Sequence, residues 1–108
     1  MAFKSKATPN IGTSGSPSTV TAAVPSGETA TLIGLSLANT TASNITVSAK
    51  VIKADTTASF LVKDATVLPG GALAIVGGDQ KVVLETGDTV SAYASAATSA
   101  DAFASYLE

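Results

Sequence analysis

The sequence predicts an all-β domain, an antiparallel β-sandwich of the jelly-roll or Greek-key kind with about seven to eight short strands. Two observations support this fold class. Turn-forming clusters recur at intervals of roughly 8 to 12 residues after residue 18, which is the spacing of short strands in a sandwich. Between those clusters, apolar residues alternate with polar or small residues, so that one side of each segment faces a core.

The clearest alternation lies in residues 31–39 and 44–53. In the first segment, one face is formed by Ile33, Leu35 and Leu37. In the second segment, the corresponding face is formed by Ile45, Val47, Ala49 and Val51. The short Asn/Thr/Ser loop between the two segments predicts an antiparallel hairpin. Its register is expected to be fixed, because a slip of one residue would turn the apolar set toward water.

Further strands are predicted at residues 19–23, 60–63, 72–76, 81–84, 89–94 and 101–107. The last two segments are rich in Ala, the best helix former, so a helix is the competing interpretation there. Residues 89–93 alternate, and the Ser/Thr-rich centre between the two segments offers competing local hydrogen bonds. A short terminal segment is also a poor helix on its own, and we therefore predict strands.

Residues 1–18 are predicted to be a flexible N-terminal arm, and residues 19–108 the β-sandwich domain. The arm consists mainly of Ser, Thr, Gly, Pro and Lys, with Ile11 isolated among them. Such a composition buries too little apolar area to offset the cost of ordering a backbone. We expect the arm to be mobile unless a partner orders it.

The chain has no His, Cys, Arg or Trp, the side chains that supply most general bases, thiolates, metal ligands and bidentate anion clamps. We therefore expect no enzymatic activity, no cofactor, and no catalytic, cofactor-binding or metal-binding residues. Only 13% of the residues are charged and the net charge is −2, which argues against a nucleic-acid partner. No apolar run approaches the roughly 18 residues needed to span a bilayer, so we expect no membrane partner.

The acidic residues are the main candidates for chemistry: Glu28, Asp55, Asp64, Asp79, Glu85, Asp88, Asp101 and Glu108. A glycosidase needs two carboxyl groups facing each other across a cleft, whereas nearly all of these lie in predicted turns or at strand ends. Calcium is the stronger alternative, at the tight loops of residues 77–79 and 85–88. Because neither loop repeats the acidic spacing of a calcium-binding loop, we expect ordinary turns there.

Aromatic side chains could form a sugar-binding platform; the candidates are Phe3, Phe60, Tyr93, Phe103 and Tyr106. Phe60 and Phe103 lie in apolar alternations and are predicted to belong to the core. Two Tyr residues without any Trp make a weak stacking surface. Because many sandwiches bind carbohydrate, a host-glycan-binding module stays an open alternative.

The outward positions of the predicted strands hold Ala, Ser, Thr and Gly instead of Lys and Glu, which normally keep sheets from associating. One interpretation is a sequence adapted for strand stability alone. The other, which we favour, is that much of this surface is buried in a homo-oligomer or in a larger assembly.

Several segments together resemble small virion structural proteins of tailed bacteriophages, especially phages of cyanobacteria and other aquatic bacteria: residues 24–40, 45–51, 60–65, 68–71, 83–90 and 105–108. The resemblance covers about residues 20 to 108 and rests on strand and turn patterns such as Pro69-Gly70-Gly71. It implies a β-sandwich accessory protein of the particle without active-site residues.

From this resemblance we expect a capsid decoration (cement) protein of the virion, assembled in the host cytoplasm. It would form a homotrimer and bind the major capsid protein on the outside of the shell. The first alternative is a neck, collar or tail accessory protein that binds other virion proteins. A host-glycan-binding module comes next, and an enzyme is the most remote alternative.

Overall fold

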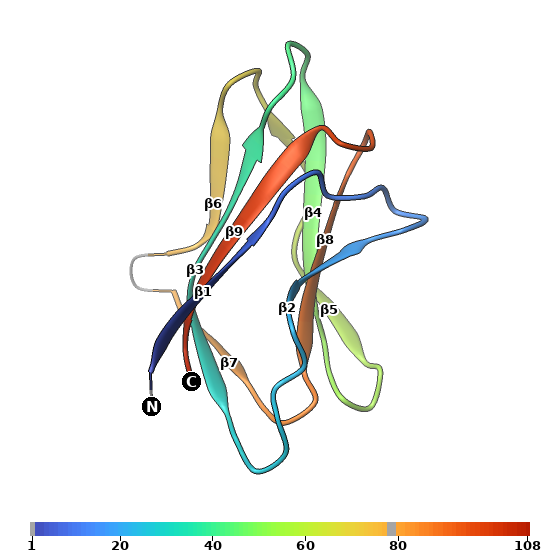
Figure 1. Ribbon diagram of the computed structural model, residues 1–108. Helices are drawn as coiled ribbons and strands as arrows, with labels where there is room; N and C mark the ends of the chain where they lie inside the picture. The colour runs from blue at the N-terminus through green and yellow to red at the C-terminus, as the bar shows by residue number, and fades with distance from the viewer. Residues whose placement is uncertain (1, 78–79) are drawn as a thin grey trace.

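The computed structural model describes residues 2–77 and 80–108, which form nine antiparallel strands in two facing sheets (Figure 1). In chain order the strands are β1 (Phe3–Thr8), β2 (Ser18–Thr21), β3 (Ala30–Asn39), β4 (Ile45–Ile52), β5 (Ala58–Val67), β6 (Ala72–Val76), β7 (Val82–Leu84), β8 (Thr89–Ala94) and β9 (Ala100–Leu107). The predicted all-β sandwich is confirmed, including strands in both Ala-rich C-terminal segments. No helix long and apolar enough to cross a membrane occurs in this part of the chain.

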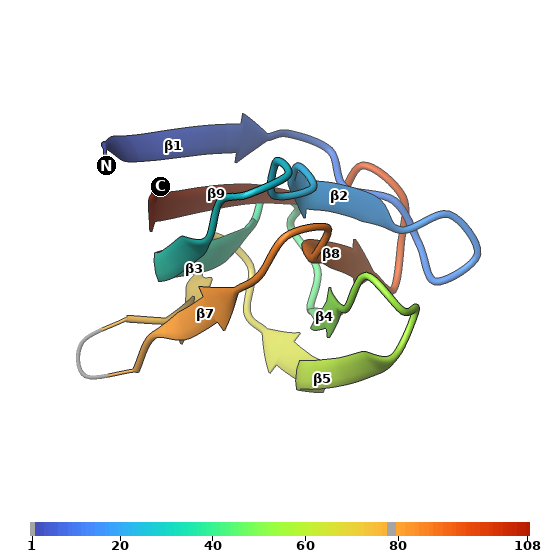
Figure 2. The same ribbon diagram turned by 90° about the horizontal axis from the view of Figure 1, so that it is seen from below.

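The two layers are seen edge-on in Figure 2. The first, sheet A, has the order β1-β9-β3-β6, and β7 pairs with β3 beyond the end of β6. The second, sheet B, has the order β2-β8-β4-β5. The two ends of the chain lie side by side in sheet A, where Ala2 N donates to Glu108 O at 2.6 Å and Glu108 N donates to Ala2 O at 2.9 Å.

The core lies between the sheets and is built from aliphatic side chains. Its largest fully buried apolar members are Ile11, Val20, Leu32, Leu35, Leu37, Val47, Leu84 and Val90. Alanines complete it on the inward sides of β8 and β9, at positions such as Ala92 and Ala104. Each buried Leu or Val contributes about 1.5–3 kcal/mol relative to exposure, so these residues supply most of the driving force for folding.

The predicted hairpin of residues 31–39 with residues 44–53 is wrong. Both segments are strands, but they belong to different sheets. In sheet A, β3 pairs with β9 along one edge and with β6 and β7 along the other. In sheet B, β4 pairs with β8 and β5. Alternation demands only that each apolar face reach the core, and two strands facing each other across a sandwich meet that demand as well as two neighbours do.

The loop between β3 and β4 crosses from one sheet to the other around the buried side chain of Asn39. The Asn39 amide donates to Ser43 O at 2.7 Å and to Val67 O of β5 at 3.0 Å, while its oxygen accepts from Thr41 N at 2.9 Å. The side chain therefore both shapes the turn and ties the end of β3 to sheet B.

The face assignment of β3 is also corrected. The pairing with β9 shifts register between Leu32 and Gly34, so that Leu32 and Leu35 both face the core and Ile33 does not. A β-bulge adds one residue to a strand and reverses the alternation on either side of it. A strict period of two could not have predicted the change.

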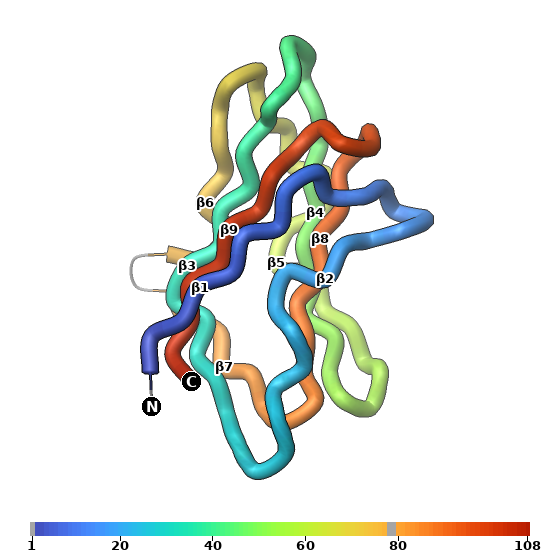
Figure 3. The backbone as a smooth tube through the Cα atoms, in the orientation of Figure 1, coloured from blue at the N-terminus to red at the C-terminus, as the bar shows by residue number. Residues whose placement is uncertain are grey.

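The N-terminal segment is ordered in the structure and does not form the expected mobile arm. Phe3–Thr8 form β1 and pair in register with residues 102–107 of β9. Figure 3 shows the two strands running side by side. Ile11 is fully buried, and its N donates to Ala100 O at 2.9 Å. Gly12 O accepts from Ala94 N of β8 at 2.9 Å, so residues 11–12 bridge the two sheets.

Backbone pairing explains why composition misjudged this segment. A strand at a sheet edge gains main-chain hydrogen bonds whatever its side chains are, and one buried aliphatic residue is enough to anchor it. The additional strand β1 raises the number of strands above the seven to eight expected to nine among the described residues.

Candidate interaction surfaces

The outward side of sheet A is a nearly uncharged surface, which we call the A face. Its members alternate with the buried residues of their strands: Phe3, Ser5, Ala7, Thr31, Ile33, Gly34, Ser36, Ala38, Ala72, Ala74, Val83, Asp101, Phe103, Ser105 and Leu107. Only Asp101 is charged, and its carboxylate accepts from Asn10 N at 2.9 Å.

Five large apolar side chains are exposed among the described residues, and three of them lie on the A face. These are Phe3, Val83 and Phe103, with relative accessibilities of 79%, 65% and 48%. The other two are Leu68 and Phe60. Single exposed apolar residues are ordinary, whereas several on one uncharged sheet face indicate an interaction surface.

Two open grooves cross the A face. One of about 290 Å³ runs beside Phe103 and is lined mainly by Ala7, Pro9, Ser36, Ala38 and Asp101. The other, of about 360 Å³, lies beside Phe3 and is lined by Lys4, Ser5, Ile33 and Ser105. Small side chains on the neighbouring strands create both grooves, because they leave the aromatic rings standing above the sheet.

The prediction that Phe60 and Phe103 belong to the core is wrong. On β9 the alanines at positions 100, 102 and 104 are buried, and Phe103 between them faces outward. On the inward side of sheet A, Ala104 and Ala102 are paired with Leu35 and Leu37 of β3, whose larger side chains fill the core beside them. Phe60 is 44% exposed on the outer side of sheet B.

The outward side of sheet B, which we call the B face, differs in composition. Its members are Thr19, Thr46, Ser48, Lys50, Ile52, Ala58, Phe60, Lys63, Asp64, Thr66, Thr89, Ser91 and Tyr93. Lys63 and Asp64 together oppose Ser48 at a bulge between β4 and β5. The B face therefore has more hydroxyl groups than the A face, and it adds two lysines, Asp64 and an aromatic pair.

The acidic loop of residues 85–88 is structural. The buried Asp88 carboxylate accepts from Lys53 Nζ at 2.6 Å, Glu85 N at 2.9 Å and Ala54 N at 3.1 Å. The hydrogen bond from Lys53 holds the pKa of Asp88 below its usual range, and the same bond raises the pKa of Lys53. Because these donors occupy the Asp88 oxygens, the carboxylate is committed to joining the loop to the turn after β4.

The remaining acidic residues are dispersed. Glu108 forms an ion pair with Lys4 at 2.7 Å, and Asp64 accepts a hydrogen bond from Ser48 Oγ at 3.4 Å. Asp55 accepts a hydrogen bond from Thr57 N at 3.0 Å, and this bond lowers the pKa of Asp55. Glu28 is exposed in the turn before β3, and Asp79 lies outside the described residues, as does Gly78 of the same loop. Across residues 2–77 and 80–108, no three acidic side chains gather as metal ligands would.

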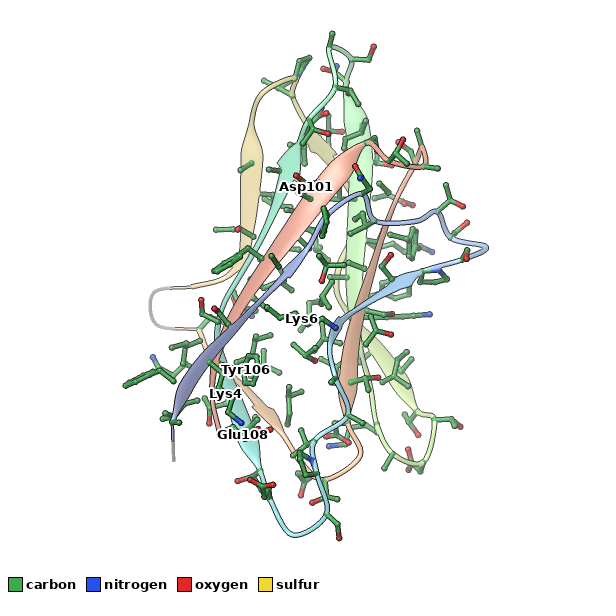
Figure 4. The ribbon with its side chains drawn as sticks, viewed as in Figure 1. Lys4, Lys6, Asp101, Tyr106 and Glu108 are labelled. Atoms are coloured by element: carbon green, nitrogen blue, oxygen red, sulfur yellow. The ribbon has the colours of Figure 1, made fainter. Side chains whose placement is uncertain are left out.

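One edge of the sandwich is bridged by long side chains of β1. Figure 4 shows Lys6 directed toward β2, where Lys6 Nζ donates to Thr19 O at 3.3 Å. Lys4 pairs with Glu108 beside Tyr106, and the bond to Glu108 raises the pKa of Lys4. Next to them, a small cavity of about 130 Å³ is lined by residues 21–25 together with Ala30, Leu84, Tyr106 and Glu108.

Sequence reasoning missed both the position of Phe103 and the aromatic pair on the B face. The signal for Phe103 was the run Ala100 to Ala104, in which three alanines alternate with Asp101 and Phe103. The presence of Asp101 on the same side as Phe103 could have indicated that the alanines, not the aromatic ring, face inward.

Comparisons with known proteins do not assign the chain to a family. No protein-family model matches it, and neither a curated protein nor a solved structure shows significant similarity to it. Any assignment of function therefore depends on the two outer faces and on the strand edges.

Proposed function

We propose that the protein is a capsid decoration protein, which binds the outside of a bacteriophage shell and reinforces it. The single observation that supports this most is the A face, an exposed sheet surface with one charged residue and three exposed large apolar side chains. A soluble monomer normally protects such a surface with Lys and Glu.

In this proposal the A face contacts the major capsid protein. The ring of Phe103 would fill a hollow of the shell, and the groove beside it would receive an apolar side chain of the shell. The binding free energy of each copy would be modest, because the surface is small and most of its residues are Ala, Ser, Thr or Gly. Repetition over many symmetry-related sites would make the attachment durable.

The free edge of β1 would join neighbouring copies into the proposed homotrimer. β1 pairs with β9 along one edge, and its other edge pairs with no strand among the described residues. An unpaired edge is a template for a strand of a second chain, since main-chain donors and acceptors are already aligned there. Light scattering of the free protein tests this: three copies are expected, and a monomer at all concentrations would refute the trimer.

The location in the particle is tested by adding purified protein to empty capsids and imaging the complexes by electron microscopy. Decoration predicts density over the whole shell, at a copy number that matches the shell lattice. Density confined to the tail vertex would replace this proposal with the neck, collar or tail alternative. Absence of binding to any part of the particle would contradict both.

A further inference from the structure

The B face contains a cluster of aromatic and cationic side chains that the proposed attachment through the A face does not use. Phe60 of β5 and Tyr93 of β8 meet edge to face, with ring centroids 6.5 Å apart and ring planes at 81°. Their strands lie on either side of β4, so the pair spans the middle of sheet B. Because Phe60 is 44% exposed, part of one aromatic ring is presented to solvent.

Two lysines converge on the same ring. Lys63 Nζ lies 5.4 Å and Lys50 Nζ 5.7 Å from the centroid of Phe60. In the described part of the chain, neither ammonium group forms an ion pair, in contrast to Lys4 and Lys53. The nearest acidic group on this face is Asp64, which is hydrogen-bonded to Ser48. Two like charges beside one ring repel each other, and an anion placed between them would relieve that repulsion.

A third observation lies in the same cross-strand row. The register aligns Thr19, Ser91, Lys50 and Phe60 across all four strands of sheet B. Ser91 is only 6% exposed, and its Oγ has no hydrogen-bond partner. Buried hydroxyl groups normally have a partner, so the Ser91 hydroxyl is an unsatisfied polar group in the strand position paired with Lys50.

We propose that Phe60, Tyr93, Lys50, Lys63 and Ser91 form a binding site for an acidic glycan. The apolar C–H face of a pyranose ring would pack on Phe60, and a carboxylate or sulfate group of the sugar would lie between the two ammonium groups. The hydroxyl-rich remainder of the B face would hydrogen-bond the sugar hydroxyls. The inference is independent of the proposed decoration function, because it uses the opposite face of the sandwich.

Nucleic acid is the competing polyanion, and the charge distribution disfavours it. Binding of a nucleic-acid backbone depends on many cationic contacts, whereas this chain has a net charge of −2 and places two lysines at the site. A glycan with one acidic group per sugar or per repeat needs no more than that pair.

The test is isothermal titration calorimetry of the full chain with four probes: oligomers of polygalacturonate, dextran sulfate, neutral dextran and a twelve-residue oligothymidylate. The proposal expects an acidic glycan to bind at least about tenfold more tightly than neutral dextran, because the ammonium pair adds charge-assisted contacts. Binding of neither acidic glycan, or equal binding of neutral dextran, would overturn it. Tighter binding of the oligothymidylate would overturn the assignment to glycans.

Matched variants locate the site. Lys50→Gln and Lys63→Gln should each weaken binding of the acidic glycan about five- to tenfold. Lys4→Gln removes the same charge from β1 of the other sheet and should leave the affinity unchanged. Equal losses in all three variants would show that only net charge matters, which would refute the site.

The aromatic contribution is tested separately, with Phe60→Leu. This variant keeps an apolar side chain at the exposed position and should weaken binding about tenfold, since the flat ring surface is lost. Amide resonances of β4, β5 and β8 in an NMR titration should shift on addition of glycan to the unmodified protein. Shifts confined to the A face would contradict the proposal even if the variants lost affinity.

Discussion

The two outer faces of the sandwich differ far more than the two inner faces. Inward, both sheets present the same kind of surface, with Leu32 and Leu35 on one side and Val47 and Val90 on the other. Outward, the A face has one charged residue, whereas the B face combines hydroxyl groups with Lys50, Lys63 and the Phe60–Tyr93 pair. Folding requires only the inner faces, so the outer faces are free to specialise, and their difference is the reason for proposing a separate partner for each.

The most direct test of the difference between the two faces concerns the proposed attachment through the A face. Phe103→Lys places a charge in the middle of the uncharged surface and should reduce binding to capsids by at least about tenfold. The free energy of unfolding should change by less than about 1 kcal/mol, because the ring is half exposed. Co-sedimentation with capsids and urea unfolding measure the two quantities.

Phe60→Lys is the matched control, since it introduces the same side chain on the B face. It should leave capsid binding intact. If both variants lost binding equally, the distinction between the faces would fail.

The largest effect on stability is expected where the two sheets are joined at the N-terminal end. Ile11 is fully buried, and the neighbouring backbone bonds β9 on one side and β8 on the other. Ile11→Ala should reduce the free energy of unfolding by about 2–5 kcal/mol, because it leaves a cavity between the sheets. Denaturant unfolding measures this, and a loss no larger than that of an exposed substitution would show that the bridge is dispensable.

A deletion separates the edge strand from that bridge. Removing residues 2–8 eliminates β1 but keeps Ile11, so the circular dichroism spectrum should retain its β character and the melting temperature should fall only moderately. Association into trimers should be lost, because β1 provides the free edge. Persistence of the trimer without β1 would refute the role proposed for this edge. Because the deletion also removes Phe3, Ser5 and Ala7 from the A face, it tests association and not capsid binding.

Asp88→Asn tests the ion pair at the end of sheet B. In the folded state the pKa of Asp88 is lowered, chiefly by the hydrogen bond from Lys53. The ionised carboxylate therefore stabilises the fold at pH values above its unfolded pKa of about 3.9. This contribution is lost as the pH falls through the folded-state pKa. The variant should be clearly less stable at neutral pH, and the difference should shrink in strong acid. A difference that does not change with pH would exclude the charge as its cause.

The smallest effect is expected at the corresponding pair of sheet A. Lys4 is exposed and bonds Glu108, which raises the pKa of Lys4. A raised lysine pKa contributes stability below the unfolded value of about 10.4, and that contribution is lost as the pH rises through the folded value. Lys4→Gln should therefore produce a small, constant decrease in melting temperature between pH 5 and pH 9 by calorimetry, smaller than that of Asp88→Asn at neutral pH.

Several elements were predictable from local signals in the chain. The strands β3, β4, β6, β8 and β9 coincide closely with segments of clear alternation or β-branched content, because period-two patterning directly reflects burial on one side of a strand. The turns between them follow Gly, Pro, Asn and Asp for the same local reason. Gly70 and Gly87, for example, have φ values of 71° and 87°, which favour glycine.

The candidate surfaces were less predictable. The expected surface of Ala, Ser, Thr and Gly matches the composition of the A face. The outward orientation of Phe103 and Phe60, by contrast, depended on which side chains of β9 and β5 fit into the core. The partners of each strand were also decided by the whole molecule. Residues 31–39 and 44–53 alternate equally well as neighbours in one sheet or as opposite walls of a sandwich.

By itself, the sequence determined that the chain is an all-β sandwich, because alternation and turn spacing are local properties that burial enforces segment by segment. Tertiary structure alone decided the pairing of β3 with β9, the ordering of β1 and the outward orientation of Phe103. Each of these depends on contacts between residues far apart in the chain. They are the backbone edge of β9 that pairs with β1, the buried site of Ile11, and the pairing of β3 leucines with the inward alanines of β9.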